Sequence, residues 1–230
     1  MTVTIRPITG IPEINAGDDL AGMLSAALRP MAPTDGDVLV VTQKVVSKAE
    51  GATRPAADEA AYRQIVEEEA EAVLRRRGPL LITVTKHGFV CANAGVDRSN
   101  VDGAQVVLLP NDPDRSAHRI RLRLERDLGV TMAVIITDTF GRAWRRGLVD
   151  VAIGVSGMLP VLDLRGSADM HGRILEVTEV AIADEIAGAA ELVTGKARGI
   201  PAALVSGYSY PPGDGRATDL IRPPAEDMFR

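Results

Sequence analysis

The residues best suited to chemistry follow a short apolar run that is typical of a buried strand. Asp138 and Thr139 come directly after Ile135-Ile136-Thr137. Because ligands of sheet proteins often bind beyond the ends of buried strands, this position favours a site. A carboxylate beside a hydroxyl supplies the oxygen ligands that Mg²⁺ or Mn²⁺ prefers. The pair therefore predicts a divalent cation site.

Three arginines follow this pair within eight residues, at positions Arg142, Arg145 and Arg146. Clustered guanidinium groups are suited to binding phosphate or carboxylate anions. A second interpretation stays open, in which Asp138 caps a helix and the arginines lie on a solvent-facing surface.

Two further polar segments also follow predicted strands, and we expect both to be loops. In segment 43–51, Lys48 can reach a phosphate as a point charge, or it can simply face solvent. In segment 93–100, Gly95 permits close approach of a ligand, and Asp97, Ser99 and Asn100 offer oxygen atoms. The alternative for Asp97 is a local turn in which its carboxylate accepts from the amide two residues on.

Composition excludes several classes of function. The net charge of −5 and the 3% aromatic content argue against a nucleic-acid-binding surface. The single cysteine, Cys91, allows no intrachain disulfide, and the three histidines lack metal-ligand spacing. No apolar stretch has the length of a signal peptide or membrane helix, so we expect a cytoplasmic protein without a membrane partner. The common glycine-rich nucleotide motifs are also absent from the sequence.

The pattern of apolar residues predicts an α+β fold with mixed sheets, in one domain over residues 1–230. Residues 211–230 read as a Pro- and Gly-rich tail or linker. Expected strands cover 2–8, 38–41, 80–85, 89–91, 106–109, 133–137, 149–155 and 202–206, with 80–85 and 89–91 forming a hairpin. Expected helices cover 20–28, 56–77, 114–128 and 175–192.

Five separated segments resemble, in order, the coenzyme F420-0:L-glutamate ligase family, which includes the N-terminal domain of a two-domain actinobacterial form. They are GDVLVVTQKVVSKAEG (36–51), NAGVDRSNV (93–101), LLPNDPDRSA (108–117), ITDTFGRAWRRG (136–147) and IADEIAGAAEL (182–192). The resemblance runs from about Val3 to Gly207. Five motifs in register are far more specific than any one of them.

The resemblance implies an enzyme that uses GTP to add L-glutamate to the lactyl-phosphate end of coenzyme F420-0, and then to F420-1, releasing GDP and phosphate. It implies Mn²⁺ or Mg²⁺, a monovalent cation such as K⁺, and an intertwined homodimer. On this sequence, the implied metal ligands are Asp97, Asp138 and Thr139. The implied GTP contacts are Ile11, Pro12, Glu13, Ile14, Gln43, Lys48 and Asn100, with Gly195 to Gly199 as a loop near the nucleotide. Gln43 replaces a serine found in some relatives.

Carboxylates and amines do not condense unaided in water, so we expect an acyl-phosphate intermediate in which positioning and charge neutralisation do most of the work. Lys48 would neutralise the phosphates, Asp138 would hold metal, and Arg142, Arg145 and Arg146 would hold the acidic substrates. Two other hypotheses stay open at this point. One is an amide ligase of the same fold that acts on another acid, and the other is a non-catalytic module that binds GTP and metal.

Overall fold

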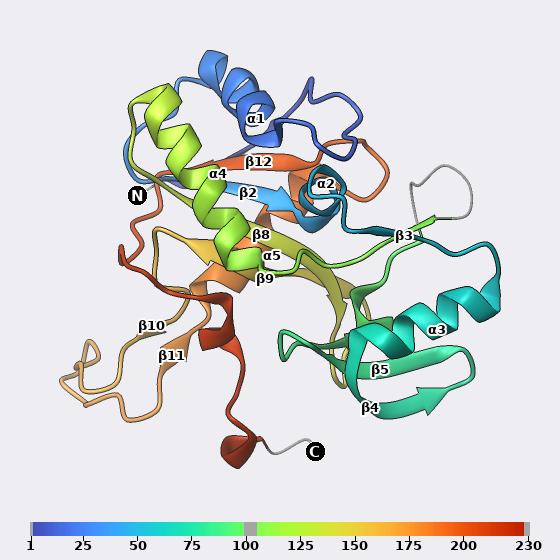
Figure 1. Ribbon diagram of the computed structural model, residues 1–230. Coiled ribbons are helices and arrows are strands. Elements are labelled where there is room, and N and C mark those ends of the chain that lie inside the picture. Colours follow the sequence, from blue (N-terminus) through green and yellow to red (C-terminus); the bar gives the residue numbers. More distant parts are fainter. Residues whose placement is uncertain (1, 99–104, 228–230) are drawn as a thin grey trace.

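The centre of the fold is a five-stranded sheet in the order β1-β12-β2-β8-β9 (Figure 1). Its strands span, in that order, Thr4–Ile8, Ala202–Ser206, Asp37–Thr42, Met132–Gly141 and Leu148–Ser156. Strands β2 and β8 are parallel, and the other neighbours in the sheet pair antiparallel. The computed structural model describes residues 2–98 and 105–227. It has the mixed α+β character that the sequence predicts.

Both faces of the central sheet are covered. Residues Val38 to Val41 of β2 are all buried, although successive side chains of a strand point to opposite faces. Helices α1 (Leu20–Leu28) and α4 (Pro113–Leu128) pack against each other, and α4 lies on β8 and β9. Helix α5 (Ile182–Thr194) packs against β9, β12 and β1. Strands β2 and β8, which lead to the predicted site residues, are therefore packed on both faces.

A smaller sheet lies beside the central one and has its own apolar cluster (Figure 1). It contains β4 (Ala70–Arg77), β5 (Leu80–Thr85) and β6 (Val90–Ala92), with helix α3 (Glu59–Glu69) packed nearby. The remaining elements that border the site are α2 (Gln43–Ala49) and the paired strands β3 (Thr53–Pro55) and β7 (Gln105–Val107).

Acidic side chains of helix α5 accept hydrogen bonds from backbone N–H groups at the outer edge of β9. The backbone N–H of Ala152 donates to Asp184 at 2.8 Å, and that of Asp150 donates to Glu191 at 3.1 Å. Burial raises the pKa of Asp184 above its ordinary range. Because edge strands otherwise present unpaired amides, these bonds tie α5 to β9. They bring the end of α5 next to Asp150.

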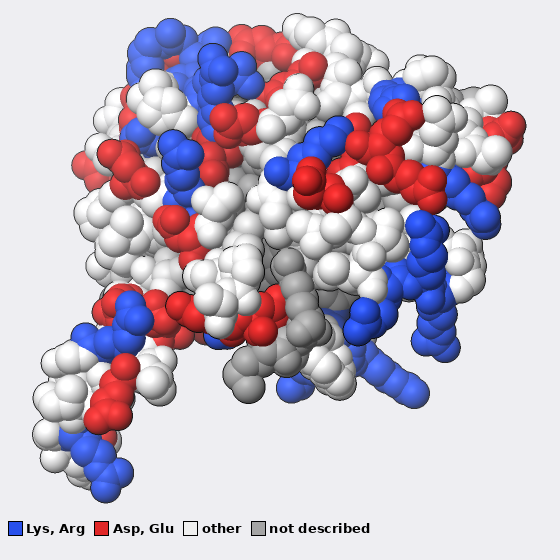
Figure 2. All heavy atoms as spheres, turned by 60° about the horizontal axis from the view of Figure 1, so that its bottom comes forward, with Lys and Arg blue, Asp and Glu red and all other residues white. Residues whose placement is uncertain are grey.

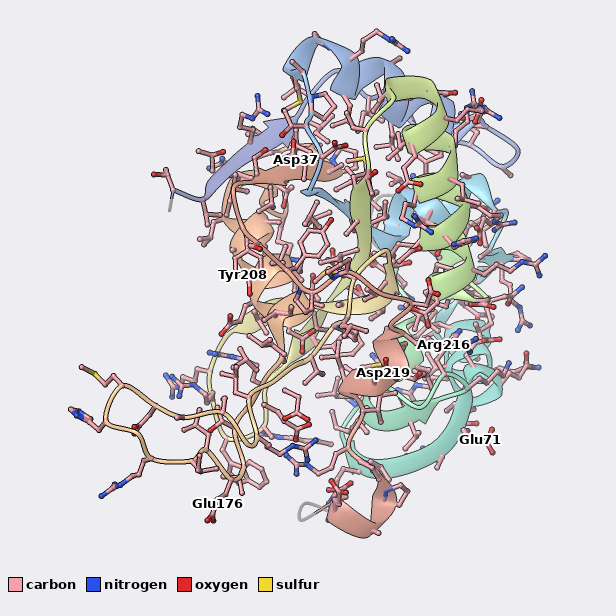
Figure 3. All side chains as sticks on the ribbon, turned by 90° about the vertical axis from the view of Figure 1, so that its left-hand side faces the viewer. Asp37, Glu71, Glu176, Tyr208, Arg216 and Asp219 are labelled. Atoms are coloured by element: carbon pink, nitrogen blue, oxygen red, sulfur yellow. The ribbon has the colours of Figure 1, made fainter. Side chains whose placement is uncertain are left out.

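Residues 162–180 form an arm that projects from the body, closed at its base by β10 (Leu162–Asp163) and β11 (Glu179–Val180). Figure 3 shows Glu176 on this arm, well away from the sheets. Figure 2 shows that the arm carries charges of both signs among uncharged residues.

The C-terminal segment returns to the body after β12. The Leu159 N–H donates to the Pro211 carbonyl at 2.9 Å, and the Ala217 N–H donates to Asp114 at 3.0 Å. Arg216 and Asp219, labelled in Figure 3, lie on this returning segment. The first part of the predicted tail, at residues 211–217, is therefore hydrogen-bonded to the body of the domain.

Most predicted elements are present within a few residues, including the hairpin of β5 and β6. The helix predicted over 56–77 is wrong in its second half, because α3 ends at Glu69 and the chain continues as β4. Alanine, glutamate and arginine are among the best helix formers, but helix propensity amounts to less than about 1 kcal/mol per residue, and backbone pairing of β4 with β5 overrides it.

The helix predicted over 175–192 also begins later than expected. Residues 175–180 belong to the arm, which ends with β11, and α5 starts at Ile182 after its N-cap Ala181. Asp184 and Glu185 then lie in the first turn, where negative charge is favourable at the positive end of the helix dipole. Across the described ranges, no helix is both long and apolar enough to span a bilayer.

Close packing of β9 on α4 gives a stability prediction. A Cβ added at Gly154 would lie 2.5 Å from the Pro113 carbonyl oxygen, whereas one added at Gly141 would meet no atom within 4 Å. We expect Gly154→Ala to lower the free energy of unfolding by about 1–3 kcal/mol because of overpacking. Gly141→Ala is the matched control and should change it by less than about 0.5 kcal/mol. Equal denaturant midpoints for the two variants would contradict the tight contact.

Candidate functional site

A pocket of about 660 Å³ lies where the two sheets meet. Six separate segments line it: the N-terminal loop, helix α2, the end of β6 with the turn after it, the end of β8, the start of β9, and the loop after α5. The structure thus brings together nearly all of the predicted site residues, namely Ile11, Pro12, Glu13, Ile14, Gln43, Lys48, Asp97, Asp138 and Thr139. Asn100 and Ser99 lie outside the described residues.

Asp138 belongs to a strand rather than to a loop after one. Strand β8 continues to Gly141, and Asp138 pairs with Val151 of β9. The alternative in which Asp138 caps a helix is therefore wrong. Burial raises the pKa of this carboxyl to about 7; the N–H of Thr139 opposes the rise, while the negative charges of Asp97 and Asp150 add to it.

Asp97 is held by an unusual turn and a short backbone ladder. Asn93, Ala94 and Gly95 all have positive φ, at 48°, 54° and 70°. This turn directs the chain so that the Asp97 backbone exchanges hydrogen bonds of 2.9 and 2.8 Å with Val107. The Asp97 carboxylate forms an ion pair of 2.7 Å with Lys44. A positive group thus already balances this acid.

The segment 43–51, predicted as a loop, begins instead with helix α2, which follows β2 without a break. Gln43 is buried, and its side-chain oxygen accepts from Ser47 at 2.9 Å. The Lys48 side chain is only 12% exposed and pairs with Glu13. The interpretation of Lys48 as a solvent-facing lysine is therefore wrong, and its charge is directed at the pocket.

A third cationic group at the pocket is Lys196, in the loop after α5. It forms ion pairs of 2.8 Å with Asp150 and 2.9 Å with Glu191, and it contacts the Thr139 hydroxyl. Burial lowers the pKa of Lys196, but these carboxylates outweigh that effect and leave the pKa raised.

Sequence reasoning missed Lys44, Asp150 and Lys196. A signal existed for Asp150, which is the one acid within the apolar run 149–155. Lys196 lies inside the glycine-bounded loop that the family resemblance indicated. Lys44 follows Gln43 directly and had no distinguishing neighbour.

The three arginines do not line the pocket. Arg142, Arg145 and Arg146 are exposed on the turn between β8 and β9, and the Arg142 guanidinium donates to the Arg146 carbonyl at 2.7 Å. These side chains therefore face solvent, as in the second interpretation of the sequence, and any role for them in holding acidic substrates lies at the rim of the pocket.

The donor chemistry of the pocket fits a hard divalent cation. The negative charge of Asp97 adds to the rise in the pKa of Asp138, and a cation between the two carboxylates would relieve that repulsion. Among residues 2–98 and 105–227, no three His, Cys, Asp or Glu side chains are arranged to hold a metal ion. Two carboxylates are nevertheless enough for Mg²⁺, which commonly completes its shell with substrate phosphates and water.

The raised pKa of Asp138 predicts a pH-dependent effect of Asp138→Asn. The unfolded carboxyl ionises near pH 4 and the folded one near pH 7. Between pH 4 and pH 7, Asp138 ionises in the unfolded chain but not in the folded one. The free energy of unfolding of the wild type therefore falls as pH rises from 4 to 7, and this decrease stays constant above pH 7.

Without divalent cations, Asp138→Asn should therefore melt at a higher temperature than wild type at pH 8, by about 8–16 °C, because a difference of about 3 pKa units corresponds to about 4 kcal/mol, with almost no difference at pH 4. Thermal melts in a chelator measure this, with the exposed Asp214→Asn as control. A variant that melts below wild type at pH 8 would show that the carboxylate is not a buried, repelled charge.

Comparisons with known proteins agree on one family. A family model described as F420-0:Gamma-glutamyl ligase matches residues 9–207. A protein of Methanothermobacter thermautotrophicus named coenzyme F420:L-glutamate ligase is 40% identical, and the alignment covers all of both chains. Proteins of the same name from Methanopyrus kandleri and Archaeoglobus fulgidus are 42% and 43% identical, over all of this chain and 98% and 97% of theirs. This chain therefore belongs to the F420-0:gamma-glutamyl ligase family, a family of ligases.

Proposed function

We propose that this protein is a GTP-dependent ligase that adds L-glutamate to coenzyme F420-0, and then to F420-1. The names of its relatives support the acceptor and the amino acid. The observation that carries the proposal for this chain is the convergence of Asp97 and Asp138 with lysines in one pocket. Acids for a metal ion and cations for phosphates are the two needs of a phosphoryl-transfer site.

Asp97 and Asp138 would hold Mn²⁺ or Mg²⁺, with Thr139 as the third protein ligand and K⁺ as an additional cation. Bound there, the divalent ion would neutralise charge on the phosphate oxygens. Thr139 is adjacent to Asp138 on a strand, so the two side chains leave on opposite faces. The Thr139 hydroxyl, now bonded to Asp150, would have to exchange that partner for the cation.

The lysines would act on the triphosphate. Lys44 pairs with Asp97, and Lys48 pairs with Glu13. A cation at Asp97 would replace the positive charge of Lys44, which could then turn to a phosphate oxygen. Gln43 and the loop 11–14 line the same side of the pocket and would hold the rest of the nucleotide.

The reaction follows from this arrangement in two steps. A carboxylate oxygen of the acceptor attacks the γ-phosphorus in line, and the bond to the β-phosphate oxygen breaks with release of GDP. The glutamate α-amine then attacks the acyl carbon, the acyl–oxygen bond breaks, phosphate leaves, and the amine proton passes to solvent. Lys48 holds the phosphates in place through both steps, so positioning accounts for most of the acceleration.

Mass spectrometry of F420-0 incubated with the protein, GTP, Mn²⁺ and L-glutamate tests the proposal. We expect a mass gain of one or more glutamyl units together with release of GDP. If GTP and metal bind but no GDP appears with both substrates present, the chain is a binding module. If another carboxylic acid is extended in place of F420-0, the chain is an amide ligase with a different acceptor.

The placement of Lys48 gives a sharper prediction. A point charge acts on any triphosphate, so Lys48→Ala should weaken GTP and ATP binding alike, with a smaller effect on guanosine. The GTP-over-ATP ratio should stay within a few-fold, because base choice depends on paired donors and acceptors at the ring edge. Calorimetric titration of wild type and variant measures all three ligands. If the variant binds GTP as tightly as wild type does, Lys48 does not contact the phosphates. If the GTP-over-ATP affinity ratio falls close to one, Lys48 contacts the base instead.

We also propose that two copies form an intertwined homodimer through the projecting arm. Met170 and Val177 on the arm are 90% and 85% exposed, and Ile174 is 60% exposed. Apolar side chains on an arm this far from the core are typical of a surface that a partner covers.

Obligate dimers commonly bury more than about 2,000 Å², so the protein should sediment as a dimer at low micromolar concentration. Met170→Asp should shift it toward monomer, while Leu122→Asp on the outer face of α4 should not. A folded wild-type monomer at that concentration would contradict the dimer.

A further inference from the structure

The turn between β8 and β9 forms part of the pocket rim. Phe140 and Leu148, which flank it, both line the pocket, and Gly141 pairs with Leu148 to close the hairpin. Residues 142–147 between them are exposed. We call these six residues the rim turn. Whatever enters the pocket from this side passes the rim turn.

The rim turn presents a large aromatic ring to solvent. Trp144 is 78% exposed, and its backbone φ of 58° lies in the left-handed region that non-glycine residues rarely adopt. A bulky residue held in this conformation is strained, and such strain is concentrated at binding sites. Core packing does not explain a tryptophan at this position.

The charge around Trp144 is of one sign. Arg142, Arg145 and Arg146 surround it in the sequence, and no acid occurs from 139 to 149. Guanidinium groups bind phosphates and carboxylates through paired N–H donors, and aromatic faces stack on planar rings. The rim turn therefore suits a ligand that combines a planar ring with anionic groups.

A nucleotide has a planar base and phosphates, and the acceptor F420-0 has a planar ring system and a lactyl-phosphate end, so both match that chemistry. The size of the pocket favours the acceptor. A volume of about 660 Å³ is that of a pocket for one ligand. The acids and lysines that suit a metal-bound triphosphate all lie inside it. A second large substrate can place only its reacting end there, and the rest must lie against the rim.

We propose that the rim turn is the docking platform of the acceptor, with Trp144 stacked on its planar ring and Arg145 and Arg146 bound to its anionic groups. This inference rests on the proposed ligase function. It makes Trp144 a determinant of acceptor specificity.

Trp144 is the only tryptophan in the chain, so its emission reports on the rim turn directly. We expect saturable quenching when F420-0 is added to the whole protein without GTP or glutamate. GTP with Mn²⁺ should leave the emission unchanged, and N-acetyltryptophanamide corrects for absorption by F420-0. Quenching by GTP and not by F420-0, or by neither, would overturn the inference.

Substitutions separate binding from folding. Trp144→Ala should raise the acceptor KM about tenfold, with kcat and the GTP KM within about twofold, as expected for a lost stacking contact. Trp144→Phe should restore most of the affinity. Trp144→Gly removes the strained φ and should melt no lower than wild type while it also binds the acceptor weakly. Leu122→Ala, exposed on α4, is the control.

A double variant, Arg145→Ala with Arg146→Ala, tests the arginines. The control is a second double variant, Arg75→Ala with Arg77→Ala, on the exposed strand β4. The first pair should raise the acceptor KM, and the rise should shrink at high salt because surface charges are screened. An unchanged acceptor KM in both the Trp144 and the arginine variants would overturn the inference. If F420-0 quenches Trp144 but gains no glutamate, the proposed function fails and the docking platform stands.

Discussion

Repulsion among Asp97, Asp138 and Asp150 at one pocket is the constraint on which the rest of the site depends. Burial raises the pKa of Asp138 to about 7, and the negative charges of Asp97 and Asp150, which come from different segments, add to that rise. A fold that only had to be stable would not gather them, because ionised groups of like sign in a partly buried pocket destabilise the folded state. Their presence is understandable if a cation occupies the pocket during function.

The architecture holds this unfavourable cluster in two ways. Backbone hydrogen bonds fix the acids, since Asp97 is locked to Val107 and Asp150 lies within the β8–β9 ladder. Lysines then balance the charge, with Lys44 at Asp97 and Lys196 at Asp150. Exchange of these lysines for a metal ion would free positive charge for the phosphates. The same residues would thereby stabilise the fold around the pocket and bind the substrates.

The sequence predicted the site better than it predicted the elements that carry it. Polar residues after apolar strands predicted Asp138 as a site residue and made Asp97 and Lys48 candidates beside structural alternatives, and the structure places all three at one pocket. The extension of β8 past Asp138 was not predictable, since it depends on pairing with β9. For the same reason residues 70–77 were assigned to a helix when pairing with β5 makes them a strand. Lys196 was missed because α5 brings it next to Asp150, from which it is 46 residues away in the sequence.

The central claim is that Asp97 and Asp138 together hold the cation that orients a nucleoside triphosphate. A crystal structure with Mn²⁺ and a non-hydrolysable GTP analogue tests it most directly, because the anomalous signal of manganese locates the ion without reference to the protein. The account predicts an anomalous peak within bonding distance of both carboxylates, with phosphate oxygens completing the shell and Lys48 turned toward them. A triphosphate bound outside this pocket, or a manganese ion that contacts neither Asp97 nor Asp138, would contradict it.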